Sequence, residues 1–314
     1  MNKETADRVI KQIIKETLDR GSRYLGIVLF GREPLINYAM GEYILKVLSK
    51  HCKEHNIILH TSIITNGTLL TKEIIDSLLE YECKYIQITI DGIKDIHDKR
   101  RIGKNGEGTF DKIIENLQML KPYKEKMNII IRVNVDKNNV NDMPELLDFF
   151  RQKGLDELSI DFGIVQGSTE VCASYDENCF VEEELGLLLS DLWKEAGKNG
   201  FTTKQRPLRK WTYCGLNNDN SFTIEPNGDV YKCWEHTGIE EHRIGNLDKE
   251  GHIENISFAY YDWMTKNPLK IEACSKCVYL PACGGGCGSV SFGDTGEYSK
   301  EGCLKIKHYH FFMI

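Results

Sequence analysis

Short apolar segments alternate with amphipathic segments over the first 200 residues, and this alternation is the feature that most constrains the fold. Helices are expected where apolar residues recur at steps of three and four, at 3–20, 36–55, 71–82, 109–120, 141–153 and 181–197. Strands are expected at 24–30, 58–64, 85–90, 128–135 and 157–164. The alternation predicts parallel βαβ units with right-handed crossovers, arranged as an open wound sheet or as a barrel.

Three of the expected strands carry polar residues on one face and branched apolar residues on the other. The polar positions are Tyr85, Gln87, Thr89 and Asp91 in the third strand, Asn128, Arg132, Asn134 and Asp136 in the fourth, and Ser159 and Asp161 in the fifth. A closed eight-stranded barrel fills its interior with apolar side chains. The polar face therefore predicts an incomplete barrel around a wet cavity that holds a polar ligand. The alternative is an open sheet with one solvated face, although parallel sheets rarely have a face exposed to solvent.

Length and charge limit the classes of protein to consider. A chain of 314 residues is long enough for two domains, and we expect them at 1–200 and 201–314, joined by the charged segment 204–210. The net charge of -7 argues against nucleic acid or an anionic membrane as a partner. The sequence has no apolar run of about 18 residues and no signal peptide at its start, so we expect a cytoplasmic protein without membrane spans.

The last third of the chain holds seven of the eleven cysteines, four of them within the fourteen residues from Cys274 to Cys287. A secreted disulfide framework does not fit a large chain with an odd cysteine count and no export signal. Closely spaced thiolates select zinc or iron-sulfur clusters. Seven thiols fit two clusters, one of them short of a cysteine; one four-cysteine zinc site with three bystanders stays open as an alternative. A β-hairpin is expected at 222–233, turning at Asn227-Gly228. Cys52 and Cys83 are interpreted as small buried hydrophobes.

The cysteine spacing resembles that of the SPASM domain, which follows the barrel of radical S-adenosylmethionine (SAM) enzymes. The similar pattern is Cys214, thirteen residues, Gly228, four residues, Cys233, a gap, Cys-x2-Cys-x5-Cys-x3-Cys, and a final Cys303. The earlier segments 31–35, 63–67, 87–92, 96–100 and 108–111 are similar to radical SAM segments at the ends of barrel strands. The resemblance implies an α/β fold, a partial (β/α)6-type radical SAM barrel missing its first strand, followed by a small cysteine-rich SPASM domain with a β-hairpin.

The resemblance also implies the chemistry of the cysteines. In such enzymes a first [4Fe-4S] cluster delivers an electron to SAM, and the resulting 5′-deoxyadenosyl radical abstracts hydrogen from the substrate. Two auxiliary [4Fe-4S] clusters are implied here, one held by Cys214, Cys233 and Cys287 and the other by Cys274, Cys277, Cys283 and Cys303. Some relatives have an eighth cysteine shortly after the first. Its absence predicts an open iron in the first auxiliary cluster, filled by water, a nearby Asp or the substrate.

For SAM, the resemblance implies that the turn from Gly31 to Pro34 meets the methionine amino group, with Glu33 as an acceptor. The ribose and carboxylate would meet Asn66, Thr89 and Arg132, and the forked guanidinium of an arginine suits two carboxylate oxygens. Asp91 and Asp161 are weak candidates for a catalytic base, although each can equally hold a neighbouring strand or a ligand hydroxyl.

Two departures from the family concern SAM cleavage. Radical SAM enzymes carry Cys-x3-Cys-x2-Cys after their first strand, and no three cysteines in this sequence have that spacing. Arg32 also stands where the family has a second glycine. These residues alone are therefore predicted not to cleave SAM reductively.

Three hypotheses follow. In the favoured one, the sequence is part of a peptide-modifying radical SAM/SPASM enzyme, and an in-frame Cys-x3-Cys-x2-Cys lies upstream of the codon for Met1. Its partners would be a peptide or protein substrate and an electron donor such as flavodoxin or ferredoxin. In the second, the chain is complete and non-catalytic, an iron-sulfur module that binds a peptide or transfers electrons. The third is a binding protein stabilised by zinc.

Overall fold

The structure is a computed structural model that describes residues 1–165, 173–180, 185–203 and 214–303. Its main sheet has five parallel strands in sequence order: β1 (Tyr24–Leu29), β2 (Ile58–Thr65), β3 (Cys83–Ile90), β4 (Asn128–Val135) and β5 (Ser159–Ile164). When neighbouring strands in a parallel sheet are also consecutive in the sequence, each right-handed crossover moves to the next strand in the same direction. The connecting helices then all cover the same face of the sheet. The five expected strands are confirmed, and their order is that of a partial barrel rather than a doubly wound sheet.

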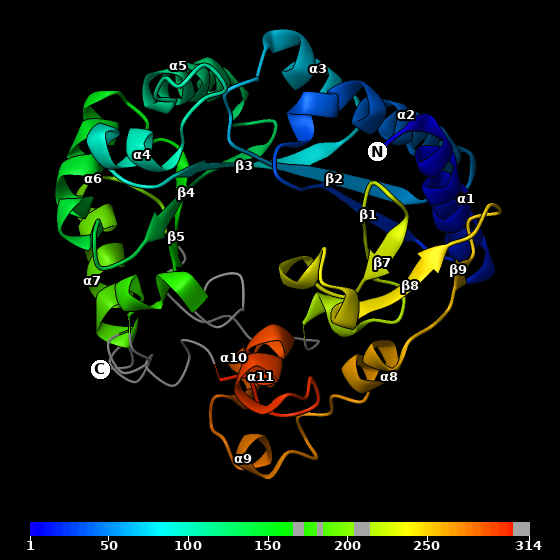
Figure 1. The fold of residues 1–314 in the computed structure, drawn as a ribbon. Helices are drawn as coiled ribbons and strands as arrows, with labels where there is room; N and C mark the ends of the chain where they lie inside the picture. Colours follow the sequence, from blue (N-terminus) through cyan, green and yellow to red (C-terminus); the bar gives the residue numbers. More distant parts are fainter. Residues whose placement is uncertain (166–172, 181–184, 204–213, 304–314) are drawn as a thin grey trace.

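The helices between these strands lie on the outer side of the arc that the sheet forms (Figure 1). They are α2 (Tyr38–Glu54), α3 (Lys72–Glu80), α4 (Lys94–Arg100), α5 (Phe110–Leu120), α6 (Met143–Gln152) and α7 (Leu185–Lys198), preceded by α1 (Lys3–Asp19). Short 3-10 helices include η1 (Pro34–Asn37) and η4 (Ala173–Asn178). Helix α4 was not expected, because its seven residues are too few to show a helical period. The expected linker 204–210 lies outside the described residues.

The two faces of the sheet differ as the alternation predicts. Ile86, Ile88 and Ile90 of β3 are fully buried against the helices, as are the matching residues of β4. On the inner face, Arg132 and Asn134 are only half-buried and Asp161 is exposed. The predicted polar face is therefore confirmed. Cys52 and Cys83 are buried as expected, although Cys83 begins β3.

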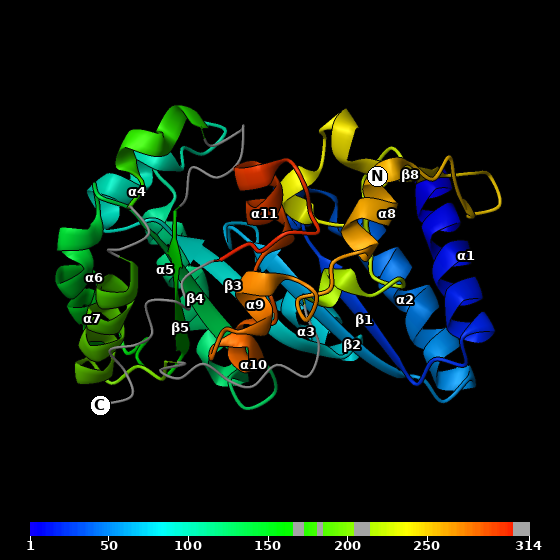
Figure 2. The same ribbon diagram turned by 90° about the horizontal axis from the view of Figure 1, so that it is seen from below.

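A second, antiparallel sheet forms in the C-terminal region, from β6 (Thr223–Ile224), β7 (Asp229–Tyr231), β8 (Arg243–Leu247) and β9 (Ile253–Glu254). The hairpin of β6 and β7 turns at Asn227-Gly228, where Gly228 has φ +99°, which confirms the predicted hairpin. Strands β8 and β9 were not expected. Helices α8 (Phe258–Met264), α9 (Glu272–Ser275), α10 (Leu280–Cys283) and α11 (Gly288–Thr295) follow. Figures 1 and 2 both place this region on the open side of the arc.

Helix α1 packs against residues of both the parallel and the antiparallel sheet. Its Val9 packs against Val230, Ile244 and Leu247 of the second sheet, while its neighbouring face packs against α2. Arg8 Nη1 donates to the Leu247 carbonyl at 2.8 Å. The boundary predicted between residues 200 and 201 remains a prediction. Helix α1 contacts both regions, and the ring of Phe30 also packs against that of Trp234. Within the described ranges, no helix has the length and apolar character needed to span a bilayer.

Candidate functional site at the sheet edge and the cysteine sets

The first part of the site lies at the carboxyl edge of the parallel sheet, where Glu33 connects the ends of β1 and β2. Glu33 Oε1 accepts from Thr65 Oγ1 at 2.7 Å and from Leu35 N at 2.9 Å, and Oε2 accepts from Asn66 N at 2.7 Å. A carboxylate has about four lone-pair sites, so one acceptor position remains for a ligand amino group. Gly31 precedes this turn with φ +145°, a conformation that favours glycine.

Asp91 follows β3 and is held by its neighbours. Arg101 Nε donates to Asp91 Oδ2 at 2.5 Å, and Asn134 Nδ2 donates to Oδ1 at 2.9 Å. Asn139, which is fully buried, donates to the carbonyls of Asp91 and Asn134 at 2.8 Å each. These contacts connect the ends of β3 and β4, as in the strand-holding alternative considered for Asp91, while its role as a base remains a prediction.

Arg132 lies beside Asp161 on adjacent strands, and its guanidinium forms an ion pair with that carboxylate. Its side chain crosses over Gly163, where an added Cβ would lie 2.0 Å from Arg132 Nη2. Thr89 is the partner of Arg132 in the register of β3 and β4, so Thr89, Arg132 and Asp161 form one polar row across three strands. Asp161 is about half exposed and Asp91 is buried, so Asp161 is the more accessible of the two carboxylates.

His97 in α4 is a site residue that the sequence did not single out. It is fully buried; Nδ1 accepts from Asp91 N at 3.1 Å, and Nε2 lies 3.1 Å from Thr109 Oγ1. Burial lowers the pKa of His97 to about 4, so the imidazole is neutral. Arg100 in the same helix pairs with the buried Asp136 at 2.9 Å. The local signal was a run of charged residues directly after a buried strand.

The second part of the candidate site concerns three cysteines from distant segments, Cys214, Cys233 and Cys287, which are called the first set. Burial raises the pKa of the Cys233 thiol to about 12, and the negative charges of Cys287 and Cys214 act in the same direction. Trp263 holds two of the segments: Nε1 donates to Leu216 O, two residues after Cys214, and its ring packs against Gly288.

The other cysteines form a second set. Burial raises the pKa of Cys274, and the next contributions come from Cys303, Glu301 and Cys283. Cys277 N donates to Cys274 O at 3.0 Å, so Cys277 lies one turn away from Cys274. The division of the seven cysteines into two cluster-binding sets, which the family resemblance implied, remains a prediction.

Glycines connect the two cysteine sets. Gly284, Gly285 and Gly286 all have positive φ, between +67° and +86°, and they separate Cys283 from Cys287. A Cβ on Gly286 would lie 1.8 Å from Gly302 O, and Cys287 N donates to that carbonyl at 2.9 Å. Such a close approach is open only to residues without a Cβ.

A buried polar cluster lies beside the first set. The Tyr298 hydroxyl is 2.6 Å from His242 Nδ1 and 3.2 Å from His236 Nδ1, and His236 Nε2 is 3.0 Å from Ser289 Oγ. The two imidazoles stack with centroids 4.0 Å apart. Burial lowers the pKa of His236 to about 4, with a further contribution from His242. The cluster joins the segment after Cys233 to the helix after Cys287, and nothing in the local sequence marked it.

Comparison with known proteins identifies the family. The family model of the Radical SAM superfamily matches residues 2–161, just over half of the chain, and the SPASM model, an iron-sulfur cluster-binding domain, matches residues 214–278. The chain belongs to the radical SAM superfamily. The expected radical SAM and SPASM regions are therefore confirmed.

Relatives within this superfamily include maturation enzymes. The chain is 25% identical over 296 residues to the cysteine-type anaerobic sulfatase-maturating enzyme of Clostridium perfringens, covering 90% of this chain and 78% of that protein. It is 23% identical over 328 residues to the serine-type enzyme of Bacteroides thetaiotaomicron, covering 93% and 76%. The solved structure of native anSMEcpe with bound AdoMet and Cp18Cys peptide matches with a TM-score of 0.67 at 21% identity, covering 98% of this chain and 86% of that chain.

Radical SAM and SPASM domains imply iron-sulfur clusters and SAM, and the donor set fits clusters. Thiolates are the usual ligands of iron-sulfur clusters, and the described C-terminal region carries seven free cysteines. Among the described residues, no three His, Cys, Asp or Glu side chains converge as the ligands of a single metal ion would. Near the three-cysteine set, Asp219 lies five residues after Cys214 and pairs with Arg20 of α1 at 3.0 Å.

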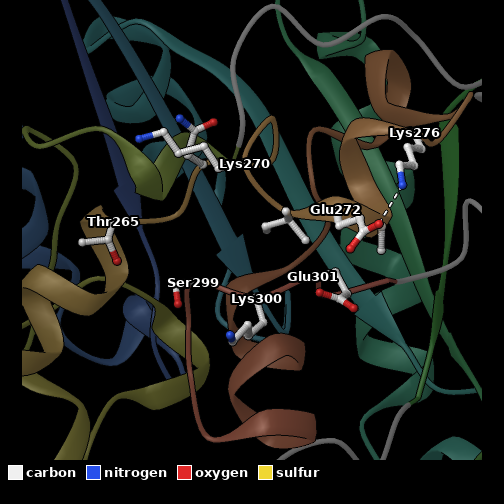
Figure 3. Close-up of a pocket in the computed structure, with 10 residues that line it drawn as sticks. Thr265, Lys270, Glu272, Lys276, Ser299, Lys300 and Glu301 are labelled. Carbon is white, nitrogen blue, oxygen red and sulfur yellow. Dashed lines mark hydrogen bonds and ion pairs between the residues drawn. The ribbon is translucent and has the colours of Figure 1, made fainter.

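A pocket of about 790 Å³ opens beside the second cysteine set (Figure 3). Its lining comes from the segments around Cys274 and before Cys303, and the charged members are Lys270, Glu272, Lys276, Lys300 and Glu301. Lys276 Nζ and Glu272 Oε1 pair across 2.6 Å. Of the lining residues, Ala273 directly precedes Cys274 and Glu301 is one residue removed from Cys303, so the charged opening lies close to the second set.

Proposed function

We propose that this chain is a peptide- or protein-modifying radical SAM/SPASM protein that holds two auxiliary [4Fe-4S] clusters and binds SAM at the carboxyl edge of its parallel sheet. The observation that carries the proposal is the match of an iron-sulfur cluster-binding model to residues 214–278, after which the further cysteines Cys283, Cys287 and Cys303 follow. Relatives that are sulfatase-maturating enzymes, and a peptide-bound neighbour of the same fold, support a peptide substrate.

Different residues at the carboxyl edge of the sheet would bind different parts of SAM. Glu33 has one acceptor position left for the amino group, Gly31 keeps the turn open, and Asn66 and Thr89 offer polar atoms nearby. Arg132 is paired with Asp161, so a ligand carboxylate would compete with that aspartate. In this family SAM supplies the hydrogen-abstracting radical, and auxiliary clusters relay electrons or bind substrate.

The two acidic candidates differ in what they can do. Asp91 accepts from Arg101 and Asn134, and these contacts suit a positioning role. Asp161 is the more accessible carboxylate and is paired with Arg132. If one of the two accepts a substrate proton, the geometry favours Asp161. An electron donor such as flavodoxin or ferredoxin completes the proposal.

Anaerobic iron and sulfide analysis of the reconstituted chain tests the cluster proposal. We expect about eight irons and eight sulfides per chain for two [4Fe-4S] clusters. Cys233→Ser and Cys274→Ser should each remove about half of the iron, whereas Cys52→Ala, which lies outside both sets in α2, should remove none. One zinc per chain without sulfide would exclude the proposal.

The same preparations test SAM. We expect isothermal titration to detect SAM binding at the sheet edge, and we expect no 5′-deoxyadenosine from these 314 residues, because they carry no Cys-x3-Cys-x2-Cys motif. Production of 5′-deoxyadenosine by the purified chain would show that other residues hold a SAM-cleaving cluster.

A further inference from the structure

Lys266 follows helix α8 and is buried beside the glycine run that separates Cys283 from Cys287. Only 5% of the residue is exposed, and its Cε would lie 3.7 Å from a Cβ placed on Gly285, in the glycine run that joins the sets. Nζ donates to the Lys300 carbonyl at 2.7 Å. An ammonium has three donors, and this carbonyl satisfies one of them.

The counter-charges of Lys266 are cysteines. Across the described part of the chain, no carboxylate forms an ion pair with Lys266. Burial lowers the pKa of Lys266, and the negative charges that oppose this are, in order, those of Cys287, Cys274, Cys283 and Cys214. These four thiols belong to both sets. A buried ammonium is costly without a compensating charge, so this position suits a protein in which the thiols are bound as thiolates.

A second buried lysine, Lys232, provides a comparison, because its ammonium has more hydrogen-bond acceptors than that of Lys266. Lys232 Nζ donates to the carbonyls of Asn218 and Ser221 at 2.6 and 2.7 Å, and it lies over the rings of Phe222 and Tyr260. The charge of Asp219 opposes the burial of Lys232 most strongly. Lys232 therefore has partners of its own, whereas Lys266 depends on the cysteines.

We propose that Lys266 is a positioning residue that supplies one positive charge to both auxiliary clusters and raises the reduction potential of each. The inference rests on the proposed function, since it requires that the two sets hold clusters. Reduction adds one electron, supplied by the electron donor, to a cluster and increases its negative charge. A nearby cation in a poorly solvated region stabilises that reduced form.

An EPR-monitored redox titration of the reconstituted full chain tests the role of Lys266. In Lys266→Met, both clusters should be harder to reduce, with about a tenfold lower ratio of reduced to oxidised cluster at a fixed potential, which is about 59 mV for a one-electron couple. Lys266→Arg keeps the charge and should restore both potentials. Lys270→Met, a change of an exposed lysine on the same segment, should shift neither.

Iron content separates failure of this inference from failure of the proposed function. If the wild-type chain does not hold about eight irons, the proposed function fails first. If Lys266→Met holds eight irons and neither potential moves, or only one moves, the shared-charge role is wrong. If both Lys266→Met and Lys266→Gln lose iron, retention of eight irons by Lys266→Arg supports the charge, and loss in Lys266→Arg as well overturns it in favour of packing.

Discussion

Substitution of Gly302 by alanine is the sharpest test of how the two cysteine sets are joined. The added Cβ would lie 1.8 Å from the Cys287 carbonyl oxygen and 2.8 Å from its carbon, distances that no real Cβ contact shows. Both partners are backbone atoms, so no side chain can turn away to make room. The segment before Cys303 must therefore move away from Cys287.

The expected cost follows from two contributions. Overpacking of this kind costs about 1–3 kcal/mol. The hydrogen bond from Cys287 N to Gly302 O, 2.9 Å long, would break and add about 0.5–1.5 kcal/mol. We expect Gly302→Ala to lower the free energy of unfolding by about 1.5–4.5 kcal/mol, the sum of the two contributions.

The assay is urea unfolding of the chain together with iron analysis after anaerobic reconstitution. Because Gly302 lies between a ligand of each set, we expect Gly302→Ala to lose iron from both clusters. Gly215→Ala is the matched control: Gly215 follows Cys214, and an added Cβ there would meet nothing within 4 Å. Equal stability and equal iron content in the two variants would refute the reasoning.

Three further predictions concern residues outside the glycine contact. Glu33→Gln should weaken SAM binding about tenfold in calorimetry while the exposed Glu80→Gln does not, because the remaining acceptor position loses its charge; equal affinities would exclude Glu33 from the SAM site. Tyr298→Phe should cost about 1–3 kcal/mol of unfolding free energy and reduce iron content, whereas the exposed Tyr261→Phe should be neutral; no difference between them would contradict a supporting role for the hydroxyl. His97 has a pKa of about 4 when folded and about 6.5 when unfolded, so its contribution is present above pH 6.5 and falls by about 3 kcal/mol as pH drops to 4; His97→Gln should flatten this part of the pH-stability curve, and an unchanged slope would contradict the assignment.

The main sheet could be predicted because each of its strands is marked by the pattern of neighbouring residues in the sequence. A strand that is buried on one face and wet on the other must alternate, and Ile86, Ile88 and Ile90 make that alternation visible. The hairpin at Asn227-Gly228 was also predictable, since few residue pairs accept its turn. Strands β8 and β9 were missed because five and two residues are too short to show a pattern.

The site could be predicted only in part. The predicted grouping of the cysteines came from the resemblance to a family, since spacing alone does not assign Cys287 to the set of Cys233 rather than to that of Cys283. The Tyr298 contacts with His236 and His242 span 62 and 56 residues, and no local period connects them. The pairing of Arg132 with Asp161 was in principle accessible, because parallel strands in the predicted order place these two residues side by side.

Binding of the proposed clusters would be linked to the stability of the whole chain. The proposed ligands come from segments that meet only when the C-terminal region is folded, so cluster binding and folding of this region would form one equilibrium. Helix α1 connects the folding of this region to the N-terminal region. Its Val9 packs against the second sheet, and its neighbour Arg20 pairs with Asp219, five residues after Cys214. The same helix packs on α2, which flanks the parallel sheet. Iron bound 200 residues later in the sequence should therefore stabilise α1, and with it the side of the barrel on which β1 and the Glu33 turn lie.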